Sequence, residues 1–523
     1  MAEYALAKTS VLAKAVQPTT PPEVPESSRV NVHAAVSRFS VLYERIRNAV
    51  DYKDDHLLRK AAIFRILKRQ LSLETDPNII GGNLIRELIA ARYLPNGAIH
   101  EEMGDKAGSV VRKYLACRRV NAGSEAYAEW LLGIISAELE ELLDDHSESK
   151  TFVNFLFEQL CERITVRDNL LDDTERRLQV YVACHRLLEK ADDEMVGFKL
   201  VRAFEPQWMK PEEWADSPTE MALTIVETEK RVRSVLTHRF SNKFLSAVKP
   251  WSISLNILRS ALHEDPPKAA ALLADPVKLH MAVERIADRR IKDSKSKLRR
   301  GTIRAMIYLF ATKMLFALIM EVPSERVIYG TVHQIPLAIN VFFAPVLMFF
   351  VGLMIRPPAK ENILRIKRGV DELLSSEGPK GREIRIARKR GWFGALMFSL
   401  AYLFTFLVSF GLVYTFLMVL HFTWVSALIF LFFLCVVSFF AFRLRNSSRE
   451  FVAVERPDNI GTIIADFFSL PVLRVGRLLS ETLSRFNVFI FFFDFIIEAP
   501  FKIFLNLLEE WSAFMKEKKE QLQ

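Results

Sequence analysis

Apolar residues recur at helical spacing through the first three hundred residues. Ile63, Ile66 and Leu67 show the pattern, because residues three and four apart share one face of a helix. No run of alternating apolar and polar residues indicates a strand in this part of the chain. The spacing therefore predicts a bundle of amphipathic helices over residues 29–300.

Beyond Arg300 the apolar residues become nearly continuous. About 20 such residues are enough to cross a bilayer as a helix. Four segments meet this requirement: 302–322, 334–355, 392–420 and 424–442. We predict that they form four transmembrane helices, arranged as two hairpins.

The loops around these segments alternate in positive charge. Residues 289–300 hold seven Lys and Arg, residues 356–390 hold eleven and residues 443–456 hold four, whereas residues 323–333 hold one and residues 421–423 none. Since Lys and Arg are retained on the cytoplasmic side, we expect both termini to be cytoplasmic. The expected location is the cell inner membrane, as a multi-pass protein, with an organellar membrane as the alternative.

These patterns divide the chain into four parts, and the predicted fold class is all-α. The parts are a disordered tail (1–28), a cytoplasmic α-helical domain (29–300), a transmembrane domain (301–445) with a basic cytoplasmic loop (356–391), and an amphipathic, interfacial C-terminal region (446–523). The first part is assigned as a tail because it is rich in proline and polar residues.

The C-terminal region leaves two interpretations open. Residues 460–485 have the spacing of a helix that lies along the membrane surface. Residues 486–508 are long enough to cross, but they carry Asp494, Glu498 and Lys502 on one helical face. We expect an interfacial or re-entrant segment there, with a fifth span as the alternative.

Composition and charge separate the same two halves. Of the 40 Phe residues, 31 lie in residues 301–523, and +7 of the net charge of +9 belongs to this apolar half. The first 300 residues are nearly neutral, so they offer no basic face for a nucleic acid. The four cysteines are too few and too scattered for a disulfide framework, which favours a reducing compartment.

Lys313 is the most distinctive residue of the apolar half. A charged side chain at the centre of a span costs about 2.5–3.5 kcal/mol, and such residues often mark a pathway or a buried ion pair. Asp494 and Glu498 are candidate partners. Asn340 and Pro345 lie in the second segment, where a proline kink beside an amide suits either a polar cavity or simple helix packing. Both interpretations of each residue remain open.

The third segment carries a stripe of small residues. Ala401, Thr405 and Ser409 fall every four residues, so they share one helical face and allow another helix to approach closely. We expect this stripe to be a helix-packing seam, within one chain or between subunits.

The first half contains no recognisable catalytic signature. It has no phosphate-binding loop, dinucleotide fingerprint, zinc-protease helix or nucleophile elbow. Asp-Asp pairs such as Asp172-Asp173 suit helix starts better than metal chelation, and Cys184-His185 with Glu189 suits a partly buried structural role. We therefore expect no catalytic residue, cofactor or metal, with the enzyme question leaning towards no.

These observations favour a membrane-anchored scaffold or adaptor with a large cytoplasmic helical domain. The alternative is a subunit of an oligomeric channel or transporter that uses the intramembrane polar residues. The expected partners are the lipid bilayer, anionic lipids through the basic residues at 289–300 and 380–390, and an unidentified protein or a second copy of the chain. No nucleic acid is expected.

Overall fold

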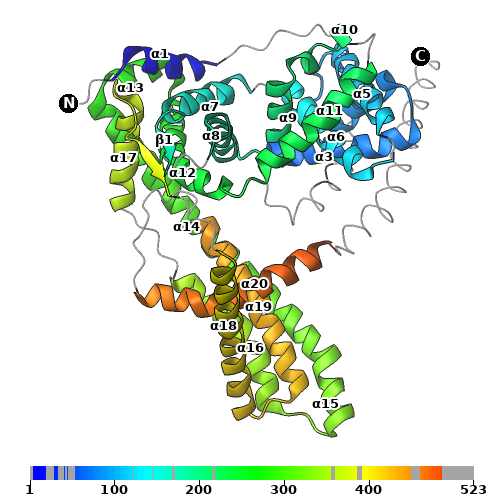
Figure 1. Ribbon diagram of the computed structural model, residues 1–523, viewed down its shortest axis with the longest axis vertical. Helices are drawn as coiled ribbons and strands as arrows, with labels where there is room; N and C mark the ends of the chain where they lie inside the picture. Colours follow the sequence, from blue (N-terminus) through cyan, green and yellow to red (C-terminus); the bar gives the residue numbers. More distant parts are fainter. Residues whose placement is uncertain are drawn as a thin grey trace, which may run out of the picture. The chain divides into compact units, whose positions relative to one another are not determined.

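The computed structural model describes residues 4–18, 29–32, 41, 44, 54–121, 123–144, 146–167, 171–214, 218–354, 360–385, 391–448 and 460–485. It is mostly helical, with 82% helix and 3% strand, which confirms the all-α class. The described residues fall into two compact units (Figure 1). The first unit comprises residues 4–276 and Asp371–Arg385, and the second comprises Val277–Val370 and residues 391–485.

Amphipathic helices build the first unit (Figure 1). They are α1 (Leu6–Ala15), α3 (Asp55–Leu73), α4 (Pro77–Ala90), α5 (Glu102–Val120), α6 (Glu125–Leu143), α7 (Ser147–Leu160), α8 (Asp173–Leu188), α9 (Asp193–Phe204), α11 (Pro218–Leu236) and α12 (Ser241–Leu262). In the described part of the unit, four short helical segments join them: η3 (Pro206–Met209), α10 (Pro211–Trp214), η4 (Pro266–Lys268) and α13 (Ala269–Ala274).

Capping side chains fix where several of these helices begin. The carboxylate of Asp172 accepts a hydrogen bond from the Thr174 amide at the start of α8, and Asp192 accepts one from the Met195 amide at the start of α9. Each cap satisfies a backbone N–H that has no partner within its helix. The two residues act as helix caps, which is the role that the sequence favours for the Asp-Asp pairs.

The core of the first unit contains the apolar faces predicted from the spacing. Ile63 and Leu67 of α3 are fully buried, and α3 packs against α4 and α6. Helices α4 and α5 approach most closely at Gly81, where an added Cβ would lie 2.3 Å from the carbonyl oxygen of Gly104. Two helices with side chains at that position would be forced apart, so glycine sets the spacing.

A short parallel sheet brings a distant segment into the first unit. Strand β1 (Ile164–Val166) pairs with β2 (Arg382–Ile384), although the sequence predicts no strand and places β2 in a basic loop of the transmembrane domain. Periodicity cannot reveal a strand of three residues. The segment before β2 also holds the N-terminus, because the Tyr4 hydroxyl donates a 2.6 Å hydrogen bond to Asp371 and the Lys8 ammonium donates a 2.6 Å bond to the Ser375 carbonyl.

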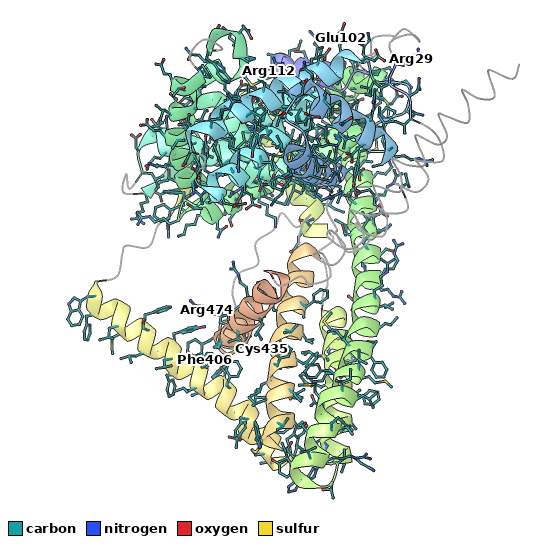
Figure 2. All side chains as sticks on the ribbon, turned by 90° about the vertical axis from the view of Figure 1, so that its right-hand side faces the viewer. Arg29, Glu102, Arg112, Phe406, Cys435 and Arg474 are labelled. Atoms are coloured by element: carbon teal, nitrogen blue, oxygen red, sulfur yellow. The ribbon has the colours of Figure 1, made fainter. Side chains whose placement is uncertain are left out.

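The second unit contains the apolar helices. They are α14 (Pro276–Phe316), the π-helical turn η5 (Ala317–Glu321), α15 (Val322–Tyr329), α16 (Gln334–Met354), α18 (Trp392–Val419), α19 (Trp424–Ser448) and α20 (Ile460–Arg485), together with most of the amphipathic helix α17 (Lys360–Leu374). Helix α20 packs in the angle between α18 and α19 (Figure 2).

Among the described residues, three helices are long and apolar enough to cross a membrane. They cover Pro276–Tyr329, Trp392–Val419 and Trp424–Phe442, whereas the apolar part of α16, Gln334–Phe350, is shorter. The coarse prediction of several apolar helices of membrane-spanning length is therefore confirmed for three segments. The expected loop at 323–333 is wrong over most of its length, because the helical path runs on through η5 and α15 to Tyr329.

Candidate functional site

Two buried glutamates lie on the helical path where the sequence predicts the end of a span and a loop. Glu321 ends the π-helical turn η5, and Glu325 follows four residues later on α15, so both side chains share one helical face. Each residue is only 1% exposed. A π-helical turn inside an α-helix often occurs at a functional site.

Glu321 receives hydrogen bonds from two other helices. The Asn340 side-chain amide on α16 donates a 2.7 Å bond to Glu321 Oε1, and the Ser426 hydroxyl on α19 donates to the same oxygen. The Asn340 amide also lies 3.4 Å from the Ser426 carbonyl oxygen. Three helices are thus joined around one carboxylate.

Glu325 is held in a similar way, nearer the ends of the helices. The His333 backbone N–H donates a 2.9 Å bond to Glu325 Oε2, and the Thr423 hydroxyl donates a 3.2 Å bond to Oε1. The Nδ1 atom of His333 lies 3.6 Å from Glu325 Oε2. His333 and Thr423 belong to the two tight connections, α15 to α16 and α18 to α19, so Glu325 links these connections.

Lys313 lies two turns before Glu321, about 12 Å along the helix axis. Its side chain is 1% exposed, and its Nζ lies 3.9 Å from the centre of the Phe433 ring on α19. Among the described residues the ammonium has no hydrogen-bond acceptor, and it interacts electrostatically with Glu321. The aromatic face and the distant carboxylate therefore stabilise this charge.

We call this set of side chains the polar ladder. Its members are Lys313, Glu321, Glu325, His333, Asn340, Thr423 and Ser426. When its buried acids and its lysine are ionised, the ladder carries one excess negative charge, so it has the chemistry to bind one small cation. Unpaired charge in a buried site is costly, so a bound cation would stabilise the ladder.

The structure places some of the predicted site residues in the polar ladder and others elsewhere. The structure brings Lys313 and Asn340 into the polar ladder, whereas Pro345 lies half-buried further along α16. Asp494, Glu498 and Lys502 lie outside the described residues, so their proposed pairing with Lys313 stays a prediction. Glu321 and Glu325 are not among the predicted site residues, although an acidic residue at the end of an apolar segment was the available signal.

The small-residue stripe on α18 faces α20 in part. The Thr405 hydroxyl donates a 2.8 Å bond to the Ala401 carbonyl of its own helix, and the Ser409 hydroxyl donates a 3.2 Å bond to the Phe468 carbonyl of α20. On the other side of α20, an added Cβ at Gly476 would lie 2.0 Å from the Cys435 carbonyl of α19. Small residues thus allow α20 to contact both neighbours closely.

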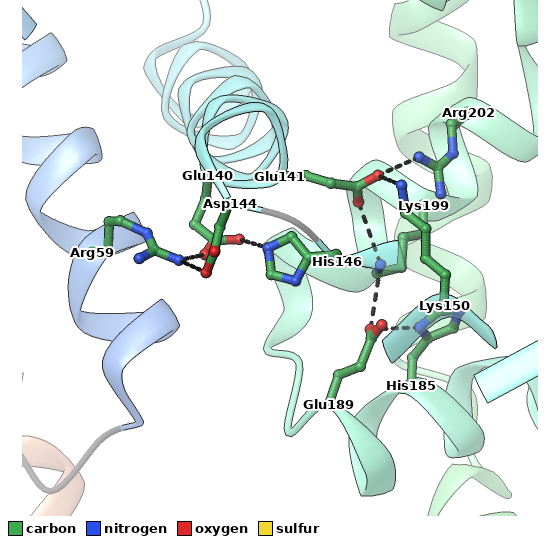
Figure 3. Close-up of polar contacts among 10 residues, drawn as sticks. All are labelled: Arg59, Glu140, Glu141, Asp144, His146, Lys150, His185, Glu189, Lys199 and Arg202. Atoms are coloured by element: carbon green, nitrogen blue, oxygen red, sulfur yellow. Dashed lines mark hydrogen bonds and ion pairs between the residues drawn. The ribbon is translucent and has the colours of Figure 1, made fainter. Parts of the chain in front are cut away.

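A buried charge network joins α6, α7, α8 and α9 in the first unit (Figure 3). The Lys199 ammonium lies 3.4 Å from Glu141 and 3.3 Å from Glu189, while His185 Nδ1 lies 2.7 Å from Glu189. Arg202 lies 2.6 Å from Glu141. Lys199 is 3% exposed and stands between two carboxylates, so this network has the form of a structural ion cluster.

The network shifts the pKa values of its acids. Burial alone would raise the pKa of Glu141, but the charges of Lys199 and Arg202 and the hydrogen bond from Lys150 outweigh it and lower that pKa to about 2. Burial would likewise raise the pKa of Glu189, and the bond to His185 and the charge of Lys199 lower it to about 2. Both groups are therefore held as carboxylates.

A group of possible metal ligands lies beside this network. Atoms of Glu140, Asp144 and His146 fall within 4.8 Å of one another. However, the Arg59 guanidinium forms ion pairs with both carboxylates, and His146 Nε2 lies 2.9 Å from Glu140 (Figure 3). The Arg59 charge is already paired with both carboxylates, so these residues form an ion-pair cluster.

Cys184 does not have the surroundings of a nucleophile. Its side chain is fully buried, and burial raises the pKa of its thiol, which disfavours the reactive thiolate. The neighbouring His185 bonds to Glu189 and not to the thiol. The three residues accordingly lie in a structural environment.

Comparison with known protein families, curated proteins and solved structures finds no match to this chain. The function is therefore inferred from the geometry of the polar ladder.

Proposed function

We propose that this chain is a multi-pass membrane protein that carries a small cation into or across the bilayer, as a subunit of a channel or transporter. One observation supports the proposal above all: the buried Glu321 carboxylate, which accepts hydrogen bonds from Asn340 and Ser426 on two other helices. Ionisable residues inside a membrane are costly and usually mark ion pathways. A purely anchoring bundle has no need of such a group.

The proposed topology has four spans, with α16 as the short second span and both termini on the cytoplasmic side. The alternation of basic residues along the sequence supports it. Engineered cysteines at positions 328 and 375 test it, since a membrane-impermeant thiol reagent is expected to label position 328 from the outside only and position 375 from the inside only. Labelling of both positions from one side would contradict four spans.

Cation movement can be measured with the full chain in liposomes. We expect a dye-reported cation influx that exceeds the leak of protein-free liposomes. Glu321→Gln is expected to lower the flux about tenfold or more, because losing the carboxylate charge removes at least about 1.4 kcal/mol of cation binding. Lys313→Leu should spare insertion but change the flux, because it alters the charge balance of the ladder.

Glu361→Gln is the matched control, because Glu361 is exposed on α17 in the same unit. Its flux should equal that of the unmodified chain. Flux that survives Glu321→Gln unchanged, or no flux above the protein-free leak, would overturn the proposal. In the second case, a protein that co-purifies reproducibly would favour the scaffold function that the sequence analysis prefers.

A further inference from the structure

We propose that the cation is a proton, that Glu321 is its binding group, and that it enters from the 330–333 connection through His333 and Glu325. This inference rests on the proposed function and adds the identity of the ion and the side from which it arrives. Three features of the polar ladder carry it: graded exposure, the kind of groups around Glu321, and the charge balance.

An exposed histidine precedes two buried glutamates at this end of the ladder. The His333 side chain is 40% exposed, whereas the side chain of Glu325 is 1% exposed. Glu321 lies one helical turn further from the connection and is also 1% exposed. The ring nitrogens of histidine can accept and release a proton, so a proton acceptor stands at the accessible end of the series. The series therefore leads from the chain connection into the bundle.

The surroundings of Glu321 suit a proton better than a metal ion. Asn340 and Ser426 both present hydrogen-bond donors to Oε1, whereas a metal cation needs several oxygen lone pairs directed at one point. Among the described residues, Oε2 of Glu321 has no hydrogen-bond partner. One carboxylate oxygen is thus stabilised by donors, and the other is open to a single proton.

The charge balance of the ladder also indicates that it takes up a single proton. The charged groups that act on Glu321 are Lys313 from α14 and Glu325 from α15, while α16 and α19 present only the uncharged Asn340 and Ser426 among the described residues. One proton on either carboxylate leaves Lys313 with a single counter-charge. The ladder is then neutral, which is the favoured state in a medium of low polarity.

The first of two proton transfers spans a short gap. His333 Nδ1 is 3.6 Å from Glu325 Oε2, slightly beyond hydrogen-bond distance. In the first step the imidazolium N–H bond breaks and an O–H bond forms on Glu325, which leaves neutral imidazole. In the second step the proton passes from Glu325 to Glu321, which regenerates the Glu325 carboxylate. Each step moves one proton and no other group.

Infrared difference spectroscopy on the full chain in liposomes tests this inference directly. Lowering the pH is expected to produce a carboxylic C=O band that is absent from Glu321→Gln and unchanged in the control Glu361→Gln. Ser426→Ala keeps the carboxylate but removes a donor to its ionised form, so the titration midpoint should move to higher pH by about one unit. His333→Gln should keep the band at equilibrium and slow its appearance after a pH jump.

The outcomes separate the inference from the proposed function. A titrating band that requires Glu321, together with no flux, would leave the proton site standing and overturn the transport proposal. Sodium-dependent flux without such a band would overturn the proton inference and leave cation transport standing. A band that persists in Glu321→Gln, or a midpoint unmoved by Ser426→Ala, would also overturn the inference, as would His333→Gln with unchanged kinetics.

Discussion

Lys199→Met is expected to lower the free energy of unfolding of the first unit by about 3–5 kcal/mol. The Lys199 ammonium is the shared counter-charge of Glu141 and Glu189, at 3.4 Å and 3.3 Å. Methionine fills a similar volume but leaves two buried carboxylates facing each other with less positive charge. Urea denaturation of the full chain in detergent, followed by tryptophan fluorescence, measures the change, because Trp130 and Trp251 lie in this unit.

The matched control is Lys190→Met. Lys190 forms a 3.2 Å ion pair with Asp54, but its side chain is 51% exposed, so solvent screens the interaction. Its replacement should lower the free energy of unfolding by no more than about 1 kcal/mol. Equal losses for the two variants would show that the buried network adds nothing beyond a surface ion pair.

The same network makes the first unit sensitive to acid. Glu141 and Glu189 have folded-state pKa values of about 2, below the ordinary value of 4.5. A lowered pKa means that the unfolded chain takes up protons first, so the stabilisation is complete above about pH 4.5 and is lost as the pH falls towards about 2. The expected loss is several kcal/mol in total, because both carboxylates titrate in this window.

His185 and His146 act in opposite directions at higher pH. Burial lowers the pKa of His185, which favours unfolding below about pH 6.5, whereas the hydrogen bond to Glu140 raises the pKa of His146, which opposes it. The main loss should therefore begin below about pH 4.5. Urea denaturation at a series of pH values measures it, and Glu189→Gln should flatten the acid limb. Full stability at about pH 3 would contradict the assignment.

The helical class was predictable because apolar spacing repeats over many turns. Ile63 and Leu67, chosen from spacing alone, are fully buried in the first unit. Strand β2 was not predictable, because three residues carry no usable period and its partner β1 lies more than two hundred residues away. The division of the basic loop between two units depends on this pairing, so it was also beyond sequence reasoning.

The candidate site was predictable only in part. Lys313 and Asn340 can be identified as candidate site residues from the sequence, because polar side chains are rare in continuous apolar segments. Glu321 and Glu325 cannot be identified in this way, because the predicted span stops beside them and the next residues resemble a loop. Only the π-helical turn and the helix after it place both carboxylates inside the bundle.

The pairing of β2 with β1 has a consequence for biosynthesis. Residues 371–385 complete the first unit, yet the ribosome makes them only after α14, α15 and α16. A nascent chain that ends at residue 300 thus lacks the strand beside Ile164 and the carboxylate that holds Tyr4. An expression fragment cut at the first apolar helix would expose this unfinished edge, whereas grafting the short segment back through a linker should restore it.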